Sequence, residues 1–283
     1  MLLIAESGST KCDWVLIEKS NKNKVTKFRT KGLNPAILKE KDLFKIISKK
    51  LIFINNKEKI KEIYFFRAGC NTEGNNQILK NVLSSFFNTD TLLIAEDMMA
   101  AVHATTTKPA VVSILGTGSN CYFYDGSKII SKKPSLGYLL MDEGSGNYFG
   151  KQLLKAYFYQ KLPKELSLSL ENRFNLSEEK VIKKLYQSKS PNKYLANFAP
   201  FLFENDDDIV IQNILQKGIH VFVENHVLQY KNELKNNPIH FVGSIAYYSK
   251  KYITKELAKH HIKAGNFIIR PIDNLINHFL NLN

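Results

Sequence analysis

Short apolar runs separated by polar turns fill the first thirty residues of the chain. The runs at residues 2–6, 12–18 and 25–30 are typical of β-strands, and the polar segments between them are short enough for tight turns. This pattern predicts an antiparallel meander. Beyond it, the apolar periodicity predicts a helix at 43–51, a strand at 62–69, a helix at 76–87, a strand at 91–96 and a helix that Asp97 caps.

A second meander follows with the same layout. Apolar runs at residues 110–115 and 121–126 flank the turn GTGSN, and a further short strand comes after them. The turn residues Ser7-Gly8-Ser9 and Thr117-Gly118-Ser119 align at an offset of 110 residues. Because the order of strands and turns repeats, the sequence predicts two related α/β domains.

The second domain is expected to be the larger one, because the pattern from Gly146 onward is mainly helical. Apolar residues there recur at spacings of three and four, and one apolar strand at residues 239–246 interrupts them. We therefore expect an N-terminal domain at residues 1–105, joined by a C-terminal helix at 272–283. A C-terminal domain with a helical insertion is expected at residues 106–271.

The composition is that of a folded protein. The chain has 283 residues, of which 44% are hydrophobic and 23% charged, which excludes the disordered and collagen-like classes. No apolar run approaches the roughly 18 residues of a membrane span, so we expect no membrane partner and a cytoplasmic location. Cys12, Cys70 and Cys121 are widely spaced and outside any CxxC pattern, which predicts reduced thiols rather than a disulfide framework or a zinc site.

The net charge of +14 suggests a nucleic-acid partner, because basic surfaces neutralise backbone phosphates. The lysines, however, lie in short scattered groups such as KEKIKE, often beside glutamate. This distribution favours a solvated surface over a nucleic-acid groove, and it is compatible with the attraction of anionic substrates.

The first hairpin, at residues 4–14, has an unusually polar turn. Gly8 allows a close approach of the backbone, Ser9 and Thr10 offer hydroxyl and amide groups, and Lys11 adds a positive charge. These groups suit a phosphate, but they also suit an ordinary hairpin that faces solvent. The hairpin alone leaves both interpretations open.

Carboxylates follow several strands and glycine-rich turns. Asp97 comes directly after an apolar strand, where it could accept a hydroxyl proton, hold magnesium or cap a helix. Asp142 and Glu143 precede a run of glycines, which suits either a polyhydroxylated ligand or the acidic start of a helix. Gly243 follows another strand, either for a close approach to a flat ring or for a buried turn.

The common nucleotide-binding signatures are absent from the sequence. The segment GSGNYFGK has the wrong spacing for a Walker A loop, and Gln152 stands where Ser or Thr is required. The GxGxxG, HExxH and GxSxG patterns do not occur either. The P-loop, Rossmann, zincin and α/β-hydrolase classes are therefore not predicted.

Motifs along nearly the whole chain do resemble a known family. In order, they are SGSTKCDW, AEDMMAA, LGTGSN, GYLLMDEGSGNYFGK, FVGSIA and PIDNLINH. With them the chain resembles the BadF/BadG/BcrA/BcrD-type ATPase family and its N-acetylglucosamine kinase members, within the ASKHA superfamily. The resemblance implies an α/β fold of two actin-like (ribonuclease H-like) ATPase domains with a cleft between them, the second domain enlarged by helices.

The resemblance also implies roles for individual residues. Asp97 matches the general base, and Glu6 stands at the metal position, where the family usually has Asp. The positions that match contacts to ATP are Gly8, Ser9, Thr10, Lys11, Thr117, Gly118 and Gly243. The positions that match contacts to the sugar are Asn34, Ser119, Asn120, Asp142 and Glu143.

The function that this resemblance implies is an ATP- and Mg²⁺-dependent sugar kinase. N-acetylglucosamine is the expected substrate, phosphorylated at its 6-hydroxyl, and a homodimer is the expected assembly. Alternatives are a kinase for N-acetylmuramic acid or glucosamine, a non-catalytic or regulatory sugar-binding protein, and a nucleic-acid binder. A dehydratase activator of the same family is disfavoured, because Cys12 and Cys121 belong to hairpins and leave only Cys70 as an iron-sulfur ligand.

Overall fold

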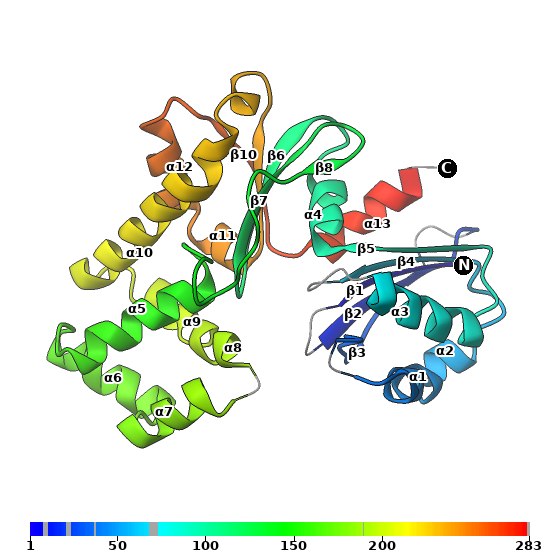
Figure 1. Ribbon diagram of the computed structural model, residues 1–283, viewed down its shortest axis with the longest axis horizontal. Helices are drawn as coiled ribbons and strands as arrows, with labels where there is room; N and C mark the ends of the chain where they lie inside the picture. The colour runs from blue at the N-terminus through cyan, green and yellow to red at the C-terminus, as the bar shows by residue number, and fades with distance from the viewer. Residues whose placement is uncertain (8–10, 21–23, 37, 68–72, 189, 282–283) are drawn as a thin grey trace. The chain divides into compact units, whose positions relative to one another are not determined.

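The computed structural model describes the whole chain except residues 8–10, 21–23, 37, 68–72, 189 and 282–283. It divides into two compact units (Figure 1). Unit 1 comprises Met1–Thr106 and Arg270–Asn283, and unit 2 comprises Thr107–Ile269. Each unit is built on a five-stranded sheet.

The sheet of unit 1 has the strand order β3-β2-β1-β4-β5. Its strands are β1 (Leu2–Ser7), β2 (Lys11–Ile17), β3 (Val25–Lys31), β4 (Glu62–Arg67) and β5 (Thr91–Glu96). The first three strands form an antiparallel meander, and β4 and β5 run parallel to β1. The strands predicted from the apolar runs are therefore present.

Helices cover both faces of this sheet (Figure 1). Cys12, Trp14 and Leu16 on β2 face the core beneath α1 (Glu40–Ser48), α2 (Leu51–Ile54) and α3 (Glu73–Phe86). The opposite face packs against α4 (Asp97–Thr105) and α13 (Pro271–Asn281). There the ring of Tyr64 stacks on that of Phe279 at 4.0 Å between centroids, which helps to fix α13 on the sheet.

The sheet of unit 2 repeats this topology with the order β10-β9-β6-β7-β8. Its strands are β6 (Ala110–Leu115), β7 (Ser119–Tyr124), β8 (Ile129–Ile130), β9 (Ile239–Val242) and β10 (Ala264–Ile268). Here too a meander of three strands lies beside two strands parallel to its first strand. The repeat inferred from the two turns is therefore a repeat of the whole sheet.

Most of the helices that the structure describes belong to unit 2. They are α5 (Gly146–Phe158), α6 (Lys164–Phe174), α7 (Glu178–Tyr186), α8 (Pro191–Ala196), α9 (Ala199–Glu204), α10 (Ile209–Phe222), α11 (Ser244–Tyr248) and α12 (Lys250–Ala258). A π-helix at Val223–Val227 and short 3₁₀-helices at Leu228–Tyr230 and Glu233–Lys235 continue from α10. Phe149, Phe222 and Phe241 are among the buried residues that join these helices to the sheet in one core.

Across the described residues, we find no helix with the length and apolar character that a bilayer crossing demands.

Gly243 marks a point where the backbone of unit 2 is tightly packed. Its φ is +115°, and a Cβ there would lie 2.2 Å from the carbonyl oxygen of Leu115. The strand predicted at 239–246 therefore ends at Val242, because this conformation breaks the strand and α11 begins at Ser244.

Gly243→Ala is therefore expected to lower the free energy of unfolding by more than about 2 kcal/mol, which urea titration would measure. Gly74→Ala is the matched control, since Gly74 lies in α3 and its Cβ would meet nothing within 4 Å. That change should leave stability equal or raise it by up to about 1 kcal/mol. Equal stability of the two variants would contradict the packing described for Gly243.

Candidate functional site

Two carboxylates lie at the carboxyl edge of the sheet in unit 1. Glu6 is near the end of β1, and Asp97 follows β5 directly. The parallel register pairs Glu6 with Phe66 of β4, and Phe66 with Ala95 of β5, so both acids are at the same edge. The Asp97 charge is close enough to raise the pKa of Glu6.

Asp97 is the first residue of α4 rather than the residue before it. Glu96 occupies the N-cap position and makes no side-chain capping bond, so the prediction that Asp97 caps the helix is wrong by one residue. The Asp97 carboxylate still accepts hydrogen bonds from the backbone N–H groups of Asp97 and Met98. The start of the helix thus orients this carboxylate at the sheet edge.

Burial controls the protonation of both acids. It raises the pKa of Glu6 to about 7, with a further rise from the charges of Asp97 and Asp13. It also raises the pKa of Asp97 to about 6, and the Glu96 charge adds to this rise. A carboxylate with a pKa near 6 is still mostly ionised at neutral pH and is a stronger base than an exposed one.

Asp13 is a third acid at this edge, and the sequence analysis missed it. It pairs with Glu6 across the β1–β2 ladder, and its Oδ1 lies 2.6 Å from Nε of Arg29. The Lys11 Nζ atom lies 3.6 Å from Oδ2 of the same carboxylate. The sequence did contain an indication of its direction, because apolar and polar residues alternate along β2. Cys12 and Trp14 face the core, so Asp13 between them must face the other side of the sheet.

The C-terminal helix also reaches this acid cluster. The backbone N–H of Ile272, in the first turn of α13, donates a hydrogen bond to the Glu6 carboxylate and opposes the rise of its pKa. The closing segment of the chain therefore contributes directly to the environment of Glu6.

Asn34 lies in the loop after β3, and a hydrogen bond ties this loop to β1. The N–H of Leu33 donates to Oγ of Ser7 at 3.0 Å. The Oδ1 atom of Asn34 accepts the N–H of Ala36 at 2.9 Å, and within the described parts of the chain its Nδ2 has no hydrogen-bond partner. Lys11 begins β2 with an exposed side chain, whereas the predicted phosphate residues Gly8, Ser9 and Thr10 lie outside the described residues.

In unit 2, the turn between β6 and β7 directs its carbonyl groups inward. The carbonyl oxygen of Gly116 accepts the N–H of Gly146 at 2.8 Å, and that of Gly118 accepts the N–H of Gly116 at 2.9 Å. The Thr117 carbonyl oxygen accepts both the N–H of Asn147 at 3.0 Å and its Nδ2 at 2.7 Å. Among the residues that the structure covers, the N–H groups of Thr117 and Gly118 have no partner, so the turn can offer them to an anion.

The Asp142 carboxylate stabilises this turn through hydrogen bonds. Its Oδ1 accepts the N–H of Ser119 at 3.2 Å, and its Oδ2 accepts Nδ2 of Asn147 at 2.8 Å. A Cβ on Gly118 would lie 2.8 Å from Oδ2, so a side chain there would require the carboxylate to shift. Asp142 itself is buried and has a φ of 71°. The structure therefore gives Asp142 a role in shaping the turn, and its contact with a sugar stays a prediction.

The neighbouring polar residues also make contacts within unit 2. Ser119 donates its hydroxyl to the carbonyl oxygen of Glu143 at 2.7 Å, and Nε2 of His226 lies 2.7 Å from Oε2 of the Glu143 carboxylate. The Nδ2 of Asn120 donates to the hydroxyl of Tyr122 at 2.6 Å. Their predicted sugar contacts are not tested by these bonds.

Gly243 lies next to the same turn. It follows β9, its N–H donates to the carbonyl oxygen of Ile268 at 2.8 Å, and its Cα faces the backbone of Leu115 at the end of β6. The carboxyl ends of β6 and β9 thus bring Gly243 and the turn at Gly116 together. The predicted place of Gly243 near adenosine stays a prediction.

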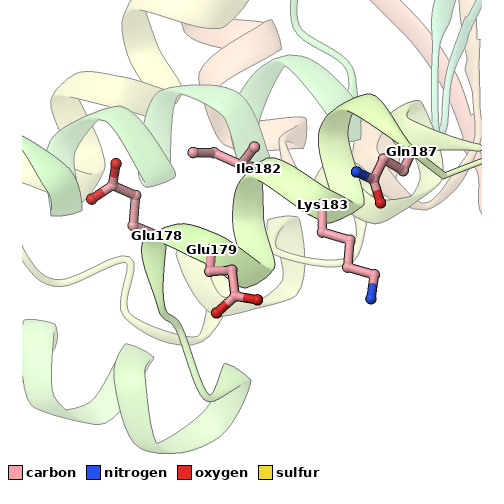
Figure 2. A pocket seen from close by; sticks show the side chains of 5 residues that line it. All are labelled: Glu178, Glu179, Ile182, Lys183 and Gln187. Atoms are coloured by element: carbon pink, nitrogen blue, oxygen red, sulfur yellow. The ribbon is translucent and has the colours of Figure 1, made fainter.

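A hollow on the surface of unit 2 contains none of the predicted site residues. It is lined by Glu178, Glu179, Ile182 and Lys183 of α7 and by Gln187 at the end of that helix (Figure 2). All of its lining residues belong to this one helix and its C-terminal end.

The raised pKa of Glu6 gives a prediction for stability. Because the folded pKa, about 7, lies above the ordinary value of 4.5, the folded state binds this proton more tightly than the unfolded state. The contribution to the free energy of unfolding is present below pH 4.5 and is lost as the pH rises through 7. Glu6→Gln should therefore stabilise the protein by about 2 to 3 kcal/mol at pH 8 and have little effect at pH 4.

Urea unfolding at both pH values, without added magnesium, would measure this difference. Glu58→Gln is the control, because Glu58 is an exposed glutamate of the same unit and its change should not alter stability at either pH. An unchanged stability of Glu6→Gln at pH 8 would show that burial of the Glu6 charge carries no cost.

No family model and no curated protein matches the chain. A solved structure from Porphyromonas gingivalis, described as a "Putative N-acetylglucosamine Kinase", matches with a TM-score of 0.91 and 29% identity over 99% of both chains. A second protein of that description, from Chromobacterium violaceum, matches with a TM-score of 0.62 and 13% identity over 98% of both chains.

A ROK family glucokinase from Streptomyces griseus, solved with glucose and AMPPNP, has the same fold. Its TM-score is 0.58, at 11% identity, over 99% of this chain and 98% of that one. The matches to the Chromobacterium violaceum and Streptomyces griseus proteins, at 13% and 11% identity, support the fold alone. The match to the Porphyromonas gingivalis protein is also a similarity of sequence, at 29% identity. The chain therefore has the two-domain α/β fold of these sugar kinases, which is the fold that its motifs predicted.

Proposed function

We propose that the chain is an ATP-dependent sugar kinase that phosphorylates an N-acetylated amino sugar, N-acetylglucosamine at its 6-hydroxyl. The whole-length likeness to the Porphyromonas gingivalis protein, at 29% identity, is the observation that carries the substrate assignment. The glucose and AMPPNP in the Streptomyces griseus structure support a sugar and ATP as the ligands of this fold.

Asp97 is assigned as the general base. Its pKa of about 6 leaves it ionised at neutral pH, and burial makes it a better proton acceptor than an exposed aspartate. In the proposed reaction it takes the proton of the 6-hydroxyl as that oxygen attacks the γ-phosphorus of ATP. The bond from this phosphorus to the β,γ-bridging oxygen breaks, and ADP leaves.

The turn at Gly116–Gly118 is assigned to the phosphates of ATP. Phosphoryl transfer depends mainly on alignment and on neutralising charge, for which backbone N–H groups are suitable. The N–H groups of Thr117 and Gly118 serve this role because Asp142 and Asn147 hold the turn on its other side. Lys11, with its exposed side chain, is assigned as a further cationic contact to phosphate.

The acids of unit 1 fit a magnesium ion. Glu6 and Asp97 are carboxylates whose proximity raises the pKa of Glu6, and a cation beside them would relieve this repulsion. Magnesium commonly binds through one or two carboxylates, with waters and substrate phosphates as its other ligands. Glu6 is assigned to hold it. When bound, the ion would neutralise negative charge on the phosphates.

Sugar contacts are assigned within each unit separately, to Asn34 of unit 1 and to Ser119, Asn120, Asp142 and Glu143 of unit 2. Asn34 supports this assignment with a free Nδ2 donor, and Glu143 supports it with Oε1, which has no partner among the described residues. Ser119, Asn120 and Asp142 already hold bonds within unit 2 and contribute through their remaining hydrogen-bonding capacity. The homodimer and the cytoplasmic location implied by the resemblance stay predictions.

A regulatory sugar-binding protein is the second candidate. Glu6 favours it, because a glutamate at the metal position is one methylene longer than the aspartate usual in the family. The same fold also occurs in a ROK family transcriptional regulator, at 11% identity and a TM-score of 0.63. Turnover separates the two candidates, since a regulator would bind sugar without transferring phosphate.

A substrate panel tests the proposed function. ADP release would be followed with ATP, magnesium and each of N-acetylglucosamine, N-acetylmuramic acid, glucosamine and glucose. We expect kcat/KM to be highest for N-acetylglucosamine, by at least about tenfold, because a site that binds the acetamido group discriminates against sugars that lack it. Sugar binding without ADP release from any of the four would favour the regulatory candidate.

Substitution of the proposed base tests the mechanism. Asp97→Asn should lower kcat by about 10² to 10⁴, because the amide cannot accept the proton, while the dissociation constant of the sugar changes less than about threefold. Asp90→Asn is the control, since it makes the same change at an exposed residue just before the opposite end of β5. A kcat for Asp97→Asn within threefold of wild type would remove Asp97 from this role.

A further inference from the structure

A buried histidine contacts one of the proposed sugar-binding residues. Nε2 of His226 lies 2.7 Å from Oε2 of Glu143, and the side chains of His226 and Glu143 are 4% and 19% exposed. None of the sequence motifs includes His226, which lies 83 residues beyond Glu143. It belongs to the π-helix Val223–Val227, a rare turn type that is frequent at functional sites.

The orientation of His226 is fixed by its own helix. Its ring stacks on Phe222 with centroids 5.1 Å apart and planes inclined by 19°. Phe222 also packs against the segment that carries Glu143, because a Cβ on Gly144 would lie 2.8 Å from Cβ of Phe222. The helix and this segment are thus held together beside the His–Glu contact.

Burial favours a neutral His226 ring that donates to Glu143. Burial lowers the pKa of His226, and Lys133 acts in the same direction, while Glu143 and Asp142 oppose them. A neutral imidazole whose Nε2 lies at hydrogen-bond distance from a carboxylate carries its proton on that nitrogen. His226 therefore uses its single N–H to hold Oε2 of Glu143.

This contact leaves the other oxygen of Glu143 for a ligand. Across the described chain, Oε1 of Glu143 has no hydrogen-bond partner, and the Glu143 side chain is partly exposed. The backbone of Glu143 is fixed as well, since its carbonyl oxygen accepts the hydroxyl of Ser119 at 2.7 Å. Hydrogen bonds thus fix both the backbone carbonyl and the carboxylate of Glu143, and together they determine the direction in which Oε1 points.

We propose that His226 is a positioning residue that holds the Glu143 carboxylate so that its Oε1 accepts a hydrogen bond from a hydroxyl group of the sugar. His226 does not touch the sugar itself. The inference rests on the proposed sugar-kinase function and adds to it a determinant of sugar affinity within the helical part of unit 2.

Two substitutions separate the N–H of His226 from the packing of its ring. His226→Phe keeps an aromatic ring against Phe222 and removes the donor, whereas His226→Gln keeps a donor and removes the ring. We expect His226→Phe to raise the KM for N-acetylglucosamine at least about tenfold, because a hydrogen bond to a charged group is lost. Its kcat and its KM for ATP should stay within about threefold, and His226→Gln should restore the sugar KM to within about threefold of wild type.

His260→Phe is the matched control, because His260 contacts Glu224 of the same π-helix, at 3.3 Å, and is not assigned to the site. Its sugar KM should equal that of wild type. If His226→Phe does not fold, His226→Asn replaces it, since the shorter amide removes the contact with Glu143 and should raise the sugar KM in the same way.

An unchanged sugar KM in His226→Phe, or in His226→Asn where that variant is used, would overturn the inference. Equal loss of sugar and ATP affinity in the Phe and Gln variants would overturn it too, because it would indicate general damage to packing. A wild-type chain that phosphorylates no sugar would instead overturn the proposed function.

Discussion

Strands that run parallel end at the same edge of their sheet, and in both units this edge carries the chemical groups. In unit 1 it brings Glu6, at the end of β1, to the same side as Asp97, which follows β5. In unit 2 it brings the turn after β6 beside Gly243, which follows β9. The repeated sheet topology therefore produces an acidic edge in one unit and, in the other, an edge whose Thr117 and Gly118 N–H groups have no partner within the described part of the chain.

The acidic edge is held at a cost to stability. Raising the pKa of Glu6 from 4.5 to about 7 means that its ionised form is disfavoured in the folded state, by about 3 kcal/mol. A buried carboxylate of this kind is tolerated when the rest of the fold is stable enough to offset its cost. Here the buried core of the sheet provides stability, and the N–H of Ile272 partly stabilises the ionised form of Glu6. In unit 2 the constraint is steric instead, because a Cβ on Gly243 would clash with the backbone of Leu115 and a Cβ on Gly118 would displace the Asp142 carboxylate. The sheet edge of unit 1 is thus constrained electrostatically, whereas that of unit 2 is constrained by close packing.

Local pattern was enough to predict much of the fold. The strand β5 spans Thr91–Glu96 as expected, and the meanders of both sheets follow their apolar runs. The helix expected at 43–51 is interrupted at Lys49 and Lys50, where α1 ends and α2 begins. The strand expected at 239–246 ends at Val242 because of the backbone conformation of Gly243. A glycine in the sequence does not by itself indicate which conformation it adopts.

The site was harder to predict, since its contacts join residues far apart in sequence. Asp142 bonds to Ser119 across 23 residues, a contact that the sequence does not indicate, and its predicted contact with a sugar stays a prediction. His226 has no motif of its own and is recognised only through its contact with Glu143. Asp13, in contrast, was within reach, because the alternation of buried residues along β2 indicates its direction.

We propose that this chain transfers the γ-phosphoryl group of ATP to the 6-hydroxyl of N-acetylglucosamine. Phosphorus and carbon NMR of the products formed with ATP, magnesium and N-acetylglucosamine test it most directly. The account predicts a phosphomonoester on carbon six of the sugar, with one ADP formed for each ester. Inorganic phosphate as the only new phosphorus species, or an ester at another carbon, would contradict it.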